Sequence, residues 1–78
     1  MNVDGRLDPK LRPAQVALLR ALDAGPRSTR ELSEALGWTV SRAHHVARRL
    51  EDRELVRRTY EADRIEWQLT ARGRERVT

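Results

Sequence analysis

Apolar residues recur at helical spacing in three separate segments before residue 51. The first segment begins at Pro13, because proline suits the first turn of a helix, and it ends before Gly25-Pro26. Its apolar residues share one helical face: Leu11, Ala14, Leu18, Ala21 and Leu22. Residues 1–10 show no periodicity, so we expect a flexible N-terminal leader followed by one folded domain over residues 11–78.

The next two segments predict a pair of short helices joined by a tight turn. Ser28 and Glu31 have the spacing of a capping box, which begins a helix over residues 29–36 that Gly37 ends. Thr39 can cap a further helix over residues 39–53. The apolar stripes of the two helices are Leu32, Ala35 and Leu36, and then Ala43, Val46, Ala47 and Leu50. Two helices with a glycine turn between them are typical of a helix-turn-helix.

After Leu50 the apolar period changes from that of a helix to that of a strand. Residues 55–60 are rich in strand-forming types, residues 61–63 can turn, and Ile65, Trp67 and Leu69 alternate with polar residues. We therefore predict a β-hairpin over residues 55–69 with one buried face. Thr70 can cap a last helical turn through Arg76, interrupted by Gly73.

Together these segments resemble winged helix-turn-helix regulators of the multiple-antibiotic-resistance-regulator (MarR) type. The matching residues are Glu31–Gly37, Thr39–Arg42, Ala43–Leu50, Leu55–Arg58, Asp63-Arg64 and Leu69–Arg74. The resemblance covers residues 13–76 and implies a mainly α-helical (α+β) fold, three helices followed by a two-stranded wing, that binds DNA. It is more specific for the fold than for one regulator family, because arsenic-repressor-like and other winged helices share the pattern.

Three features depart from the family pattern. Glu54 stands where members often have glycine, so we expect a non-glycine residue in the left-handed conformation, at a cost of about 1 kcal/mol. The wing tip carries Glu61 and Asp63, whereas a wing that enters a DNA groove would be basic. The long terminal helices that build the dimer and effector pocket of MarR-type proteins have no counterpart here, which argues against effector sensing.

The charge of the chain favours the second half as a nucleic-acid surface. The net charge is +4; residues 1–38 carry six basic and five acidic residues, and residues 39–78 carry ten and seven. Only Lys10 is a lysine, and guanidinium groups suit bidentate recognition of phosphate and guanine, although an arginine-biased genome explains this ratio equally well. The absence of cysteine excludes disulfides and thiolate metal sites.

The predicted helix over residues 39–53 presents the main candidate DNA-binding face. With its apolar stripe inward, the opposite side carries Ser41, His45 and Arg48. Its flanks and neighbours complete the candidate site: Thr39, Arg42, His44 and Arg49 on the same helix, Arg30 at the preceding helix, and Arg64 in the wing. The start of this helix would approach base edges in a major groove, and its later arginines would approach phosphates.

Other residues in this region have simpler explanations. Trp67 shares the buried side of the hairpin, so we expect a core role, and Trp38 either covers the turn or stays partly exposed. Tyr60 fits a phosphate contact and strand-end packing equally well. Adjacent His44 and His45 point about 100° apart, so we expect no metal site and no cofactor, although their protonation at mildly acid pH would strengthen DNA binding.

No arrangement of catalytic residues is visible, so the leading hypothesis is a non-enzymatic, DNA-binding transcription regulator that acts as a homodimer. We expect it in the cytoplasm with the nucleoid, because no apolar stretch is long enough to span a membrane and residues 1–5 do not resemble a signal peptide. The alternatives are a winged-helix protein-interaction module in a larger assembly and a binder of structured RNA. A protein-interaction module would expose an apolar rather than a basic face on the helix over residues 39–53.

Overall fold

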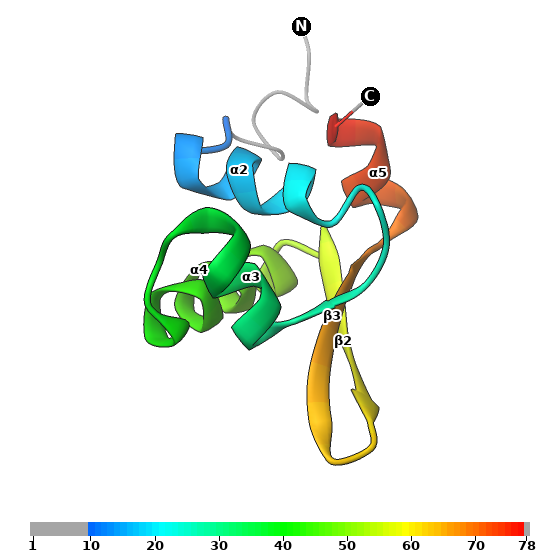
Figure 1. Cartoon of the computed structure of the whole chain (residues 1–78). Helices are drawn as coiled ribbons and strands as arrows, with labels where there is room; N and C mark the ends of the chain where they lie inside the picture. The colour runs from blue at the N-terminus through cyan, green and yellow to red at the C-terminus, as the bar shows by residue number, and fades with distance from the viewer. Residues whose placement is uncertain (1–9, 78) are drawn as a thin grey trace, which may run out of the picture.

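The computed structural model describes residues 10–77 as helices packed against one end of a small antiparallel sheet (Figure 1). The predicted leader lies outside these residues, except for Lys10. In chain order the described elements are α2 (Pro13–Ala21), β1 (Arg27–Ser28), α3 (Thr29–Leu36), α4 (Val40–Asp52), β2 (Val56–Glu61), β3 (Arg64–Leu69) and α5 (Ala71–Val77). The mainly α-helical architecture with a β-hairpin is therefore confirmed.

Local hydrogen bonds set the ends of α3, as the sequence predicts. The Glu31 N–H donates to Ser28 Oγ at 3.1 Å, and the Ser28 N–H donates to Glu31 Oε1 at 2.8 Å. The backbone bond from Ser28 is the main reason that the pKa of Glu31 lies below its ordinary value. Gly37 ends α3 in the left-handed region with φ of 70°.

Capping also sets the start of α4, and backbone geometry sets its end. Thr39 Oγ1 accepts the Arg42 N–H at 3.0 Å, which confirms Thr39 as the cap. Two residues beyond α4, Glu54 has φ of 62°, which confirms the left-handed conformation expected at this non-glycine position. The chain thus reverses direction after α4 at the expense of backbone strain.

The sheet has three strands in the order β1-β3-β2, so the prediction of two strands missed one. The hairpin of β2 and β3 turns at Ala62 and Asp63, which both have positive φ. Arg27 pairs with Trp67, and Ser28 pairs with Glu66. The same Ser28 caps α3, so β1 joins the start of this helix directly to the hairpin.

One apolar core lies between the helices and the base of the sheet. Trp67 is fully buried in it, and its Nε1–H donates to Thr29 Oγ1 at 2.9 Å, which confirms the predicted core role. Ala35, expected in the apolar stripe of α3, is exposed, because Ser33 takes the inward position. The buried apolar residues are Leu18, Leu19, Leu22, Leu32, Ala43, Val46, Ala47, Leu50, Leu55, Val56, Trp67 and Leu69.

The last helix, α5, runs through Gly73 rather than breaking there, so the expected interruption is wrong. Thr70 Oγ1 accepts the Gly73 N–H at 3.0 Å and caps the helix as predicted. Gly73 is buried against the backbone carbonyl of Leu55, and a Cβ at this position would overlap that oxygen. The glycine therefore allows a close approach of two backbone segments.

Candidate nucleic-acid interface

Helix α4 is amphipathic, with a buried apolar side and an exposed polar side. Its buried residues are the predicted Ala43, Val46, Ala47 and Leu50. Its exposed residues include five of the predicted site residues: Ser41, Arg42, His45, Arg48 and Arg49. The capping residue Thr39 is also exposed, immediately before the helix. The polar side of α4 thus offers hydroxyl, imidazole and guanidinium groups to solvent.

The exposed arginines of α4 differ in their partners. Within residues 10–77, no carboxylate pairs with Arg42 or Arg49. Arg42 instead lies over the ring of Trp38, with its Cζ 4.8 Å from the ring centroid. Arg48 Nε lies 3.7 Å from Glu51 Oε1, which partly neutralises its charge. The unpaired positive charge of α4 is therefore carried by Arg42 and Arg49.

His44 and Arg58 connect α4 to the sheet through Trp67. The ring of His44 meets the ring of Trp67 edge-on, with centroids 5.8 Å apart, so His44 is half-buried rather than freely exposed. The guanidinium of Arg58 lies 4.9 Å from the Trp67 centroid and makes two hydrogen bonds to Glu51, at 2.9 and 3.0 Å. The bonds from Arg58 are the main cause that lowers the pKa of Glu51.

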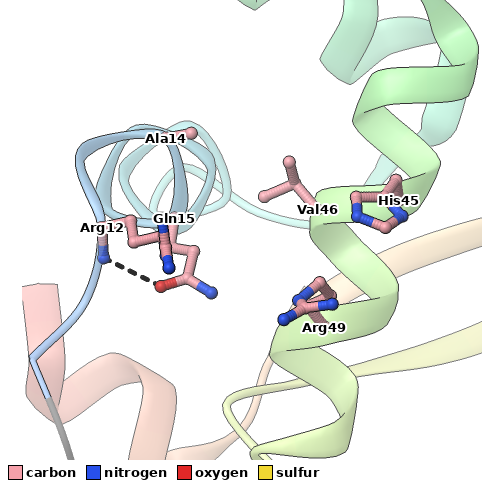
Figure 2. Close-up of a pocket in the computed structure, with 6 residues that line it drawn as sticks. All are labelled: Arg12, Ala14, Gln15, His45, Val46 and Arg49. Carbon is pink, nitrogen blue, oxygen red and sulfur yellow. Dashed lines mark hydrogen bonds between the residues drawn. The ribbon is translucent and has the colours of Figure 1, made fainter.

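An open pocket of about 330 Å³ lies between α2 and α4 (Figure 2). Polar side chains on its walls come from both helices, and Ala14 and Val46 supply its apolar surface. Gln15 Oε1 accepts the Arg12 N–H at 2.8 Å. His45 and Arg49 line the pocket from α4. The sequence did not reveal this pocket, because it depends on how α2 packs across α4.

The hairpin presents a mixed surface. Arg64 is exposed, but its Nη2 lies 2.7 Å from Glu66 Oε2, and this bond raises the pKa of Arg64. Glu61 and Asp63 are exposed at the tip, as the sequence indicates. Tyr60 is 71% exposed, which contradicts the strand-end packing alternative, and the phosphate contact stays a prediction. On α3, Arg30 is exposed and has no ion pair among the described residues.

Within residues 10–77, the side chains form no cluster of metal ligands and the helices include no membrane span. No group of three or more His, Cys, Asp or Glu side chains comes together there as a set of metal ligands. None of the helices described there has the length and apolar character that crossing a bilayer requires.

The two helices α3 and α4, the exposed basic side of α4 and the hairpin that follows define a winged helix-turn-helix domain. A family model narrows the class further. It describes the MarR family and matches residues 10–64, so the chain belongs to the MarR family. The resemblance inferred from the sequence is confirmed.

Solved structures of other proteins share this fold. BpsR of Bordetella bronchiseptica, whose DNA binding is regulated by 6-hydroxynicotinic acid, is 29% identical with a TM-score of 0.82, over 94% of this chain and 56% of that chain. MepR, a transcription regulator of the Staphylococcus aureus multidrug efflux pump MepA, is 25% identical with a TM-score of 0.81, again over 94% and 56%. YusO of Bacillus subtilis is 28% identical with a TM-score of 0.82, over 86% and 50%.

This chain spans about half the length of these solved structures. No curated protein is similar enough to be matched to it.

Proposed function

We propose that this domain binds double-stranded DNA as part of a non-enzymatic transcription regulator, with α4 in a major groove and the β2–β3 hairpin as a wing. The observation that carries the proposal is the solvent-exposed side of α4, where Arg42 and Arg49 have no carboxylate partner within residues 10–77. An α-helix fits the major groove of B-DNA. The relatives BpsR and MepR are described as a DNA-binding protein and a transcription regulator, which supports the same reading.

The candidate residues divide by position along the interface. Ser41, Arg42 and His45 near the start of α4 would meet base edges, because a helix-turn-helix inserts that end deepest. Phosphate contacts would come from Thr39, Arg30, Arg48 and Arg49, and Arg64 would reach the adjacent minor groove from the wing. His44 contributes chiefly by packing against Trp67.

The proposal also covers the oligomeric state of the domain and its location in the cell. A single domain of this size covers little DNA, so we propose that it acts as a homodimer at the nucleoid in the cytoplasm. Structured RNA fits less well, because the major groove of an RNA duplex is too narrow and deep for side chains to read. A protein-interaction role fits less well because the open side of α4 is basic rather than apolar.

The test is a titration of the protein onto duplex DNA over a series of salt concentrations. We expect affinity to fall steeply with salt, with a slope that becomes smaller by about one for each phosphate contact removed. Arg49→Ala should weaken binding several-fold and reduce the slope in this way, and Arg42→Ala should weaken it at least as much. Arg74→Ala removes the same charge from α5, away from α4 and the wing tip (Figure 1), and serves as the control.

An Arg74→Ala variant that weakens binding as much as Arg49→Ala would contradict the proposed surface. Binding that does not change with salt would contradict the proposed function. Duplex RNA as a competitor separates the two nucleic acids, because the proposal requires DNA to compete at much lower concentration.

A further inference from the structure

Trp38 occupies a fixed position in the turn between α3 and α4. Its backbone N–H donates to the Ser33 carbonyl at 2.9 Å, and its half-buried side chain packs against the apolar core. It precedes the cap of α4 by one residue, so its ring lies beside the first turn of that helix. The core therefore holds an aromatic ring next to the end of α4 that the proposed function directs into the DNA.

Arg42 is restrained at both its backbone and its side chain. Its N–H donates to Thr39 Oγ1 at 3.0 Å, and its guanidinium carbon lies 4.8 Å from the Trp38 ring centroid. A cation over an aromatic face is attracted by the ring, with tryptophan giving the strongest attraction. The arrangement orders the guanidinium and leaves it without an acidic partner among residues 10–77.

Three other arginines near α4 and in the hairpin differ from Arg42, because each has an acidic partner. Arg48, Arg58 and Arg64 each pair with a glutamate of the same chain, so each has to give up or share that partner to bind a phosphate or base. Arg42 keeps its full charge and its donors while its position is limited by Trp38. A planar guanidinium that is ordered before binding loses less conformational entropy when it forms two parallel hydrogen bonds.

We infer that Arg42, positioned by the ring of Trp38, reads a guanine in the major groove of each recognised half-site. Guanine presents O6 and N7 on the edge that an arginine can grip with two N–H groups. Arg42 is the third residue of α4 and is exposed, so it belongs to the part of the helix that reaches deepest. Trp38 is a positioning residue here. The inference rests on the proposed DNA binding and adds a base and a pair of residues to it.

The first experiment asks whether one guanine depends on Arg42. Duplexes bound by the protein are selected from a random pool, and each guanine of the resulting site is replaced in turn by 7-deazaguanine, which lacks N7. We expect at least one replacement to weaken binding by the parent protein about tenfold. In Arg42→Ala the ratio of affinities for guanine and 7-deazaguanine at that position should fall to within twofold of one, while ratios at other guanines persist.

The second experiment separates positioning from packing. Trp38→Phe keeps an aromatic face, and Trp38→Leu keeps an apolar side chain without one. We expect the ratio of affinities for guanine and 7-deazaguanine to stay near the parent value in Trp38→Phe and to fall to about a third of it in Trp38→Leu. The reason is that a cation–aromatic contact at an exposed site changes an equilibrium constant by a factor of a few. Thermal unfolding followed by circular dichroism identifies any loss of fold, and the ratio is compared only at temperatures where each variant is folded.

The outcomes of these experiments separate a failure of this inference from a failure of the proposed DNA binding on which it rests. If Arg42→Ala keeps the parent ratio at every guanine, the guanine reading is overturned while DNA binding stands. If Trp38→Leu and Trp38→Phe both match the parent ratio, the positioning role of Trp38 is overturned. If the parent protein selects no duplex and binds none in the salt series, both are overturned together.

Discussion

Glu51 connects α4 to the sheet through an ion pair with Arg58. Its carboxylate accepts two hydrogen bonds from Arg58 and lies near Arg48. Replacing it leaves the partly buried guanidinium of Arg58 without its acidic partner. We expect Glu51→Gln to lower the free energy of unfolding at pH 7 by about 1 kcal/mol, measured by urea denaturation. Glu34→Gln, an exposed change on α3, should have little effect.

The same residue gives the stability a pH dependence of known sign. The pKa of Glu51 is lowered in the folded state from its ordinary value of 4.5, chiefly by Arg58. Its contribution is therefore complete above that value and disappears as the pH falls through the lowered pKa. The parent protein should lose stability below about pH 4.5, and Glu51→Gln should lose less over the same range. Some loss should persist in the variant, because the pKa of Glu31 is lowered as well.

Glu66 forms an ion pair with Arg64, the candidate DNA-binding residue of the wing. Their side chains are 2.7 Å apart, so under the proposed function Arg64 has to exchange a carboxylate for a phosphate or a groove edge. Glu66→Gln should increase DNA affinity two- to threefold at low salt, because an exposed ion pair holds an arginine by at most about 1 kcal/mol. In a protein that already carries Arg64→Ala, adding Glu66→Gln should give no increase in DNA affinity. An equal gain in both backgrounds would show that only the removal of negative charge matters.

The sequence predicted which residues form the candidate site better than it predicted the contacts that those residues make. The polar positions of α4 follow from its apolar stripe, and the structure exposes five of them as expected. The partners were not predicted. The ring contact of His44 depends on Trp67 of another element. The ion pair of Arg64 joins two residues of β3 whose spacing of two places them on one face, so the sequence could have indicated it. The contact between Trp38 and Arg42 was also missed, because Trp38 lies in the turn before α4 and the position of its ring depends on packing against the core.

At the scale of elements, Gly73 of α5 lies in close contact with the backbone of Leu55, the residue preceding β2. Gly73 lies against the Leu55 carbonyl, which also accepts the Thr70 N–H at 3.1 Å and so cannot move freely. We expect Gly73→Ala to lower the free energy of unfolding by about 1–3 kcal/mol, even though alanine favours helices. The measurement is urea denaturation, with exposed Arg74→Ala as the control. A stabilised Gly73→Ala variant would contradict the close approach.

The helices were predicted well because their signals are local. Ser28, Glu31 and Gly37 define α3 through contacts within a few residues, and Thr39 does so for the start of α4. Strand β1 was not predicted, because its two residues acquire strand geometry only by pairing with β3, almost forty residues away. The interruption expected at Gly73 was wrong for a similar reason. The glycine is needed for its contact with Leu55, which lies in another part of the chain.

At the scale of the molecule, the sequence predicted the apolar core but not the pocket between α2 and α4. One core unites α2, α3, α4 and the sheet, and its members were largely recognisable from periodicity. Leu19 and Gln15 are buried although they lie outside the predicted stripe of α2, because the helix contacts α4 and α5 over a broad face. The pocket of about 330 Å³ beside α4 reflects the same packing, which no single segment encodes.

The pairing of β1 with β3 connects the hairpin to the start of α3. Ser28 is hydrogen-bonded into the sheet opposite Glu66 and at the same time caps α3, which packs on α4. Ser28 therefore links the position of the hairpin to that of α3. Under the proposed function, a hairpin held to the helices in this way would adjust little to the duplex, and the DNA would deform instead. Pliant stretches of DNA would then be favoured over stiff ones at positions that no side chain touches.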